Sequence, residues 1–253
     1  MTTKYPTLAK PPIKEAILQL LVLPSDTYEQ DLLKIFVEKE SDKYPNNAPQ
    51  KETLIQFISG EEGQHAGVTN KGVNGYKITS EDGQNIAQVF KDRLAVSRLD
   101  SYTTWDDLLA ETQRLWGVYI KNFRPQKVAT LSVRYINQFM LPPEMKSFED
   151  YLDSTPNIPD VLPQGLATFY VNYKLPDPDM GAVASVQLLF EGVKFDEESK
   201  EPRLPIVLDI DIFMRLEVAS DAAEIWDGFS KLRDFKNEIF FETLKEKTLE
   251  MFR

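Results

Sequence analysis

Two aspartates in one predicted strand are the first residues whose spacing could support chemistry. Asp209 and Asp211 stand two positions apart in the run LPIVLDIDIFMRLE, residues 204–217. Because side chains alternate along a strand, both carboxylates would lie on one face, roughly 7 Å apart. Such a pair can hold Mg²⁺ or act as an acid and a base, but the sequence does not identify the further oxygen ligands that magnesium needs. We expect each aspartate to pair with a lysine or arginine of a neighbouring strand.

Arg134 is the second candidate, in the run KVATLSVRYINQFM, residues 127–140, at the middle of the chain. Alternation separates Arg134 from the apolar residues around it, so we place it on the open face of a sheet. There it could form a structural ion pair with one of the aspartates. Alternatively, it could belong to a polar floor that binds a ligand or a partner. The candidate binding residues are Arg134, Asn172, Lys174, Asp209 and Asp211, and Gln187 and Glu191 would share the floor.

Few other residues suit catalysis. The chain has no cysteine, and its one histidine, His65, lies in the glycine-rich stretch 61–74, which we interpret as a loop or hairpin tip. The glycine patterns that cradle phosphates and the nucleophile elbow are absent from the sequence. We therefore predict no catalytic residue, no metal site and no cofactor, and we expect a binding protein rather than an enzyme.

The net charge of −11 argues against generic binding to nucleic acid, which requires a positive field. Lys91, Arg93 and Arg98 make the predicted strand 86–99 basic, but no aromatic residues alternate with them as in a single-strand platform. Such charges are typical of an edge strand, where they discourage aggregation.

The sequence shows no signal peptide and no run of about 18 apolar residues, so we expect a cytoplasmic location with no membrane contact.

The elements that must position these residues follow from periodicity and from turn residues. Asp82 and Gly83 lie between two strand-like runs, which is a strong hairpin signal. In the first half we predict strands at residues 13–23, 53–59, 76–80 and 86–99, and helices at residues 28–43 and from Thr103 or Thr104 to residue 123.

The second half repeats nearly the same order. We predict strands at residues 127–140, 167–175, 182–193 and 204–217, a short helix at 147–152, and a last helix that runs nearly to Arg253. Asp221 and Glu224 form a capping-box pattern at the start of this last helix. The sequence thus predicts an α+β fold of two β-α-β-β-β-α units in tandem, residues 1–125 and 126–253. Antiparallel strands would carry the helices on one face, in one shared sheet or in two packed units.

Three short motifs resemble those of an uncharacterised, sporadically distributed prokaryotic family. They are the PIKEA run from Pro12, the VRYIN run from Val133 and the YTTW run from Tyr102. The family has a P-I-x-E-A-type start and an L-R-Y-I-N-type central strand. The resemblance implies no particular activity. The patchy distribution of the family implies a role in phage defence or in conflict between mobile elements.

Three functions remain open from the sequence. The first is a non-catalytic interaction or adaptor protein, with a protein partner or a second copy of itself. A homodimer is expected because the last helix carries apolar residues on more than one face, including Phe240, Phe241 and Leu244. The second is a sensor that binds a small polar ligand or nucleotide on the open sheet face. The third is a metal-dependent hydrolase or nuclease that uses Asp209 and Asp211.

Overall fold

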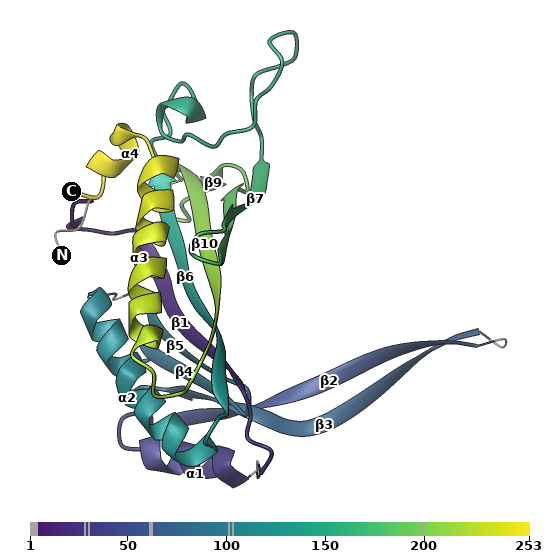
Figure 1. Ribbon diagram of the computed structural model, residues 1–253. Coiled ribbons are helices and arrows are strands. Elements are labelled where there is room, and N and C mark those ends of the chain that lie inside the picture. The colour runs from purple at the N-terminus through teal and green to yellow at the C-terminus, as the bar shows by residue number, and fades with distance from the viewer. Residues whose placement is uncertain are drawn as a thin grey trace.

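A computed structural model describes residues 5–27, 29, 31–60, 63–100, 102, 104–198 and 200–253, and side chains within these ranges except at 52–71. Figure 1 shows one large sheet with helices against it. The elements in the described residues are β1 (Ile13–Leu23), α1 (Asp31–Glu40), β2 (Asn46–Gly60), β3 (Gly63–Thr79), β4 (Asn85–Phe90), β5 (Arg93–Leu99), α2 (Trp105–Phe123), β6 (Lys127–Leu141), the 3₁₀ helix η1 (Phe148–Asp150), β7 (Phe169–Asp177), β8 (Ala182–Phe190), β9 (Lys194–Phe195), β10 (Pro202–Val218), α3 (Glu224–Thr243) and α4 (Glu246–Glu250).

The strands form a single antiparallel sheet in the order β2-β3-β4-β5-β1-β6-β10-β8-β7, and β9 pairs with β10. The first strand of each half, β1 and β6, pair with each other, with Leu18 opposite Val133. The two halves therefore share one sheet. The structure does not confirm two β-α-β-β-β-α units, because four strands separate α1 from α2 and the second half has η1 in place of the short α-helix.

The core lies on one face of this sheet. Ala16, Leu18 and Leu20 of β1 are fully buried, while the residues between them are half-buried. The helices α1, α2 and α3 lie on the buried side, and no helix of the described residues covers the opposite face (Figure 1). The predicted α+β class, antiparallel pairing and one-sided helices are confirmed, because alternation along each strand reports which face is covered.

The helix ends follow local chemistry in α2 but not in α3. The Thr104 hydroxyl accepts a hydrogen bond from the Asp107 amide at 3.1 Å, and Arg124 ends α2 in the left-handed region (φ 46°). The capping box predicted at Asp221 is wrong, because α3 begins at Glu224 without a side-chain cap. The last helix also stops early, since Leu244 is extended and bridges to Leu152 before α4 begins.

Of the two interpretations of residues 61–74, a loop or a hairpin tip, the described residues 63–74 fit the second, because they belong to a strand of a long hairpin. Residues 63–79 form β3, but only residues 75–79 pair with β4, and the rest pair with β2 alone. The hairpin therefore projects beyond the sheet (Figure 1). His65 lies in β3, while its side chain falls outside the described parts of the chain.

The predicted strand 86–99 is in fact two strands, β4 and β5, joined at Lys91 and Asp92.

Among the helices in the described ranges, none has the length and apolar character needed to cross a membrane.

Candidate functional site

The five residues predicted as a polar floor lie on the open face of the sheet. Arg134 stands opposite Asp211 in the β6–β10 register. Asp209 and Asn172 are both register partners of Gln187, and Asp211 and Lys174 are both partners of Ser185. Asn172 and Lys174 lie on β7, two strands away from the aspartates, which corresponds to about 10 Å. The structure thus brings Arg134 to the aspartates but leaves Asn172 and Lys174 apart from them.

Arg134 forms the predicted ion pair, and its partner is Asp209. Its Nη2 and Nε atoms donate to Asp209 at 2.6 and 3.0 Å, and the Asp209 side chain is only 11% exposed. Asp211 instead accepts a hydrogen bond from the Ser132 hydroxyl at 3.0 Å. Burial raises the pKa of Asp211 above its ordinary value, although Ser132 and Arg134 oppose this shift. The charges of Arg134 and Asp209 are therefore satisfied by each other within the sheet.

The floor offers little to a metal ion. Within the described residues, no group of three or more histidine, cysteine, aspartate or glutamate side chains could hold one. Asp209 already accepts a two-pronged guanidinium contact, which occupies both of its oxygens. The hydrolase hypothesis therefore gains no support from the geometry around Asp209 and Asp211.

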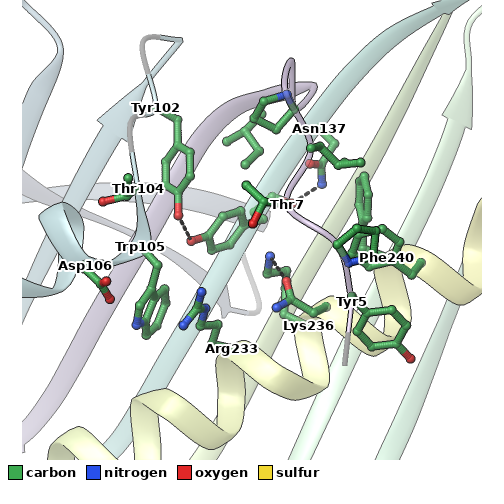
Figure 2. A pocket seen from close by; sticks show the side chains of 17 residues that line it. Tyr5, Thr7, Tyr102, Thr104, Trp105, Asp106, Asn137, Arg233, Lys236 and Phe240 are labelled. Atoms are coloured by element: carbon green, nitrogen blue, oxygen red, sulfur yellow. Dashed lines mark hydrogen bonds between the residues drawn. The ribbon is translucent and has the colours of Figure 1, made fainter. Parts of the chain in front are cut away.

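Sequence reasoning missed a cavity of about 330 Å³ on the other, helix-covered face. It lies between the N-terminal arm, the start of α2, the strand β6 and the helix α3 (Figure 2). Its lining residues are Tyr5, Pro6, Thr7, Leu8, Pro11, Ile13, Tyr102, Thr104, Trp105, Asp106, Tyr135, Asn137, Arg233, Lys236, Asn237, Phe240 and Phe241.

Aromatic side chains form much of the wall. The hydroxyls of Tyr102 and Tyr135 are hydrogen-bonded at 3.0 Å, and the two rings meet edge to face at 5.7 Å. Burial raises the pKa of both tyrosines, so both hydroxyls are protonated at neutral pH. Trp105 is buried beside them at the first position of α2. The cavity thus presents flat apolar surfaces together with a polar hydroxyl pair.

Two cations of α3 point into this aromatic setting (Figure 2). The Lys236 Nζ atom lies 4.0 Å from the centre of the Tyr135 ring, and the Arg233 guanidinium lies 5.4 Å from that of Trp105. Lys236 donates a hydrogen bond to the Asn237 side-chain oxygen at 2.6 Å. Neither cation forms an ion pair with a carboxylate of the described chain. Burial, and then the charge of Arg233, lower the pKa of Lys236 to about 7.

The remaining walls come from Asn137 and the N-terminal arm. Asn137 is only 1% exposed and donates to the Leu208 carbonyl at 3.1 Å, and it forms part of the cavity wall. Tyr5 stacks on Phe241 with ring centres 4.7 Å apart, and the Lys10 amide donates to the Phe252 carbonyl. The arm therefore covers apolar surface of α3 and the C-terminal segment.

In comparisons with known proteins, no family model matches the sequence and no curated protein matches it. The resemblance to the sporadically distributed prokaryotic family stays a prediction.

Proposed function

We propose that the protein is a non-catalytic binding protein whose cavity holds a small anionic ligand with a flat, partly apolar body. The observation that carries this proposal is the pair Arg233 and Lys236. Both line the same cavity, and neither has a carboxylate partner within the described chain. In a chain with a net charge of −11, a cavity cation without a carboxylate partner in the described chain is an exception, and an anionic ligand would supply the missing negative charge.

The cavity suits a metabolite-sized molecule. Its volume of about 330 Å³ is at the lower end of the range for small-molecule sites, which combine apolar walls with a few polar groups. Tyr102, Trp105 and Tyr135 offer ring faces and edges to a flat ligand. Asp106 is the one carboxylate of the lining, and it is exposed. The net charge that the lining offers a ligand is therefore positive.

This proposal keeps the predicted ligand sensor but changes its place. The sequence suggested the open face around Arg134, where the guanidinium is in fact paired with Asp209 at 2.6 Å. Arg233 and Lys236, in contrast, form no ion pair with a carboxylate of the described chain. The ligand site therefore belongs to the helix-covered face.

The tandem arrangement predicted from the sequence supports the same position. We retain it as a proposal: β1 and β6 would correspond, as would α2 and α3, which end the two halves. Tyr102 and Trp105 belong to the first half, whereas Tyr135, Arg233 and Lys236 belong to the second. The cavity would then lie at the junction of two units, where ligand sites are common.

A thermal-shift experiment tests the ligand site. Phenyllactate, phenyl phosphate and adenosine monophosphate are each added to the full chain, because a ligand that binds only the folded state raises its Tm. We expect at least one of these aromatic anions to raise Tm in the wild type and in Lys231→Met, an exposed position of the same helix. Lys236→Met and Arg233→Met should lose the shift. No shift with any of the three, or an equal shift in Lys236→Met, would contradict the proposal.

A second candidate function, the predicted protein interaction, is favoured by the β2–β3 hairpin. Residues 63–73 pair with β2 alone, and β2 is at the edge of the sheet. A two-stranded hairpin has little stability by itself, and an edge strand is a template for another strand. We propose a second copy of the chain as the partner, because antiparallel pairing of two identical edges obeys two-fold symmetry. The role in phage defence stays a prediction.

Shortening the hairpin tests this candidate. Lys51 and Val73 are register partners, so Asn-Gly can join them in place of residues 52–72. We expect a dimer by light scattering for the wild type and a folded monomer for the shortened chain. A monomeric wild type, or a shortened chain that stays dimeric, would contradict the candidate.

A further inference from the structure

Besides carrying a positive charge in part of the molecules, Lys236 has the surroundings of a reactive amine. Its Nζ atom lies over the Tyr135 ring at 4.0 Å and donates to the Asn237 amide oxygen at 2.6 Å. Within the described chain, no carboxylate forms an ion pair that would hold the amine as an ammonium ion. Apolar surroundings and a nearby cation are the two conditions that activate a lysine as a nucleophile toward carbonyl compounds.

We infer that the Lys236 amine reversibly forms an imine with the carbonyl group of an aromatic α-keto carboxylate held in the cavity. The inference rests on the ligand site proposed above and goes beyond it, since that site requires only non-covalent binding. Arg233, one helical turn from Lys236 on α3, would pair with the carboxylate of the keto acid. The aromatic walls would hold its ring, which places the carbonyl group between the two cationic side chains.

The condensation is balanced without any other reactant. The lone pair of the Lys236 nitrogen attacks the carbonyl carbon, a C–N bond forms as the C=O π bond breaks, and one amine proton is transferred to the carbonyl oxygen. Loss of that oxygen as water, with the second amine proton, leaves the C=N bond. The hydroxyls of Tyr102 and Tyr135 line the same cavity and are linked at 3.0 Å, so they can pass a proton to the departing oxygen.

The charged and titratable groups around the amine favour its neutral form on balance. Arg233 comes from the same helix, Tyr135 from β6 and Tyr5 from the arm. Asp106 lies in the first turn of α2, and Tyr102 precedes this helix. Of these, Arg233 disfavours the ammonium ion and Asp106, which is exposed, favours it. Burial acts in the same direction as Arg233, and the resulting pKa of about 7 leaves about half of the amine neutral at neutral pH.

Reductive trapping tests the imine. The full chain is incubated with phenylpyruvate at pH 8, reduced with sodium cyanoborohydride and mapped by peptide mass spectrometry. An ordinary lysine, with a pKa near 10.4, is neutral in well under about one molecule in a hundred at this pH. Among the lysines we therefore expect one adduct, on Lys236, at roughly a hundredfold the level on the exposed Lys231, and peptide mapping separates it from labelling of the N-terminal amine, whose pKa is ordinarily about 8. Lys236→Met should give no such adduct and Arg233→Met a reduced yield.

Equal labelling of Lys231 and Lys236, or no adduct at all, would overturn the inference. Phenyllactate separates this outcome from a failure of the ligand site, because it has the same ring and carboxylate but no carbonyl group. If phenyllactate raises Tm while phenylpyruvate leaves no adduct, the imine is wrong and the ligand site stands. If none of the aromatic anions raises Tm and no adduct forms, both are wrong. An unchanged far-ultraviolet spectrum confirms that each variant folds.

Discussion

The two faces of the sheet use arginine and lysine in opposite ways. On the open face, Arg134 lies opposite the aspartates of β10 and is neutralised by Asp209 at 2.6 Å. On the helix-covered face, Arg233 and Lys236 lie against the rings of Trp105 and Tyr135 and have no carboxylate partner in the described chain. A charge that is paired within the chain, as in Arg134, contributes to the stability of the fold. A charge without such a partner, as in Arg233 and Lys236, is available to bind the anionic group of a ligand.

Among the single substitutions, removal of Arg134 should have the largest effect on stability. Arg134→Ala leaves the nearly buried Asp209 carboxylate without its partner, and we expect a loss of about 2 kcal/mol in the free energy of unfolding. This is below the cost for a fully buried pair because the Arg134 side chain is 40% exposed. Chemical denaturation measures the loss, and ligand binding in the cavity should be unchanged.

Two further variants sharpen this prediction. Lys174→Ala lies on the same face, and its exposed side chain should cost less than about 0.5 kcal/mol. Arg134→Met combined with Asp209→Leu removes both charges and should restore most of the stability. If Arg134→Ala instead keeps full stability and abolishes ligand binding, the contrast between the two faces is reversed.

The pH dependence of stability should come from the cavity. Lys236 has a pKa lowered from 10.5 to about 7 in the folded chain, so between these values the unfolded state binds more protons. The free energy of unfolding should therefore rise with pH from about 7 to 10.5 through this group, by up to about 1.4 kcal/mol per unit. Denaturation at several pH values should show this contribution in the wild type and in Lys231→Met but not in Lys236→Met. An identical slope in Lys236→Met would show that the lysine titrates normally.

Loss of the Lys236 charge should stabilise the protein while it removes the site. Lys236→Met keeps the apolar stem but not the buried ammonium, and we expect a gain of about 1 kcal/mol at pH 6, or a Tm higher by a few degrees. Binding of phenyllactate should be lost in the same variant. A less stable Lys236→Met would mean that the lysine serves the fold, as Arg134 does.

The smallest effect is expected at Asp211. Its pKa is raised by burial, so the carboxylate is less favourable in the folded chain than in the unfolded chain at neutral pH. Asp211→Asn should increase the free energy of unfolding by about 0.5 kcal/mol at pH 7, and the gain should vanish as pH falls below the unfolded pKa near 3.9. Thermal denaturation at pH 7 and pH 3 measures this difference, and a destabilised variant at pH 7 would contradict it.

Much of the sheet could be predicted from the sequence because its signals are local. Alternation placed Arg134 and the two aspartates on the open face, but the pairing of β6 with β10, which brings Asp209 to Arg134, is known only from the structure. The turn at Lys91 and Asp92 was missed because it contains neither glycine nor proline, and Asp92 is a single turn-forming residue within a charged run. The break at Leu244 was missed as well, since it depends on pairing with Leu152, which is distant in the chain.

The cavity could not be predicted because its parts are far apart in the sequence. Tyr102, Tyr135 and Lys236 come from three elements, and only the crossing of α3 over β6 brings them together. Arg233 and Lys236 are one turn apart on a helix, a spacing that usually marks a solvated face. The apolar residues that suggested a dimer, Phe240 and Leu244, are buried within the chain, and the homodimer itself stays a prediction.

The most direct test of the central claim is a calorimetric titration of phenyllactate at pH 7.5 in two buffers with different ionisation enthalpies. A bound anion should favour the ammonium form of Lys236, so the account predicts binding with uptake of a fraction of a proton. Lys231→Met should behave like the wild type, and Lys236→Met should show neither binding nor uptake. Equal binding by the wild type and Lys236→Met, or no binding by the wild type, would contradict the account.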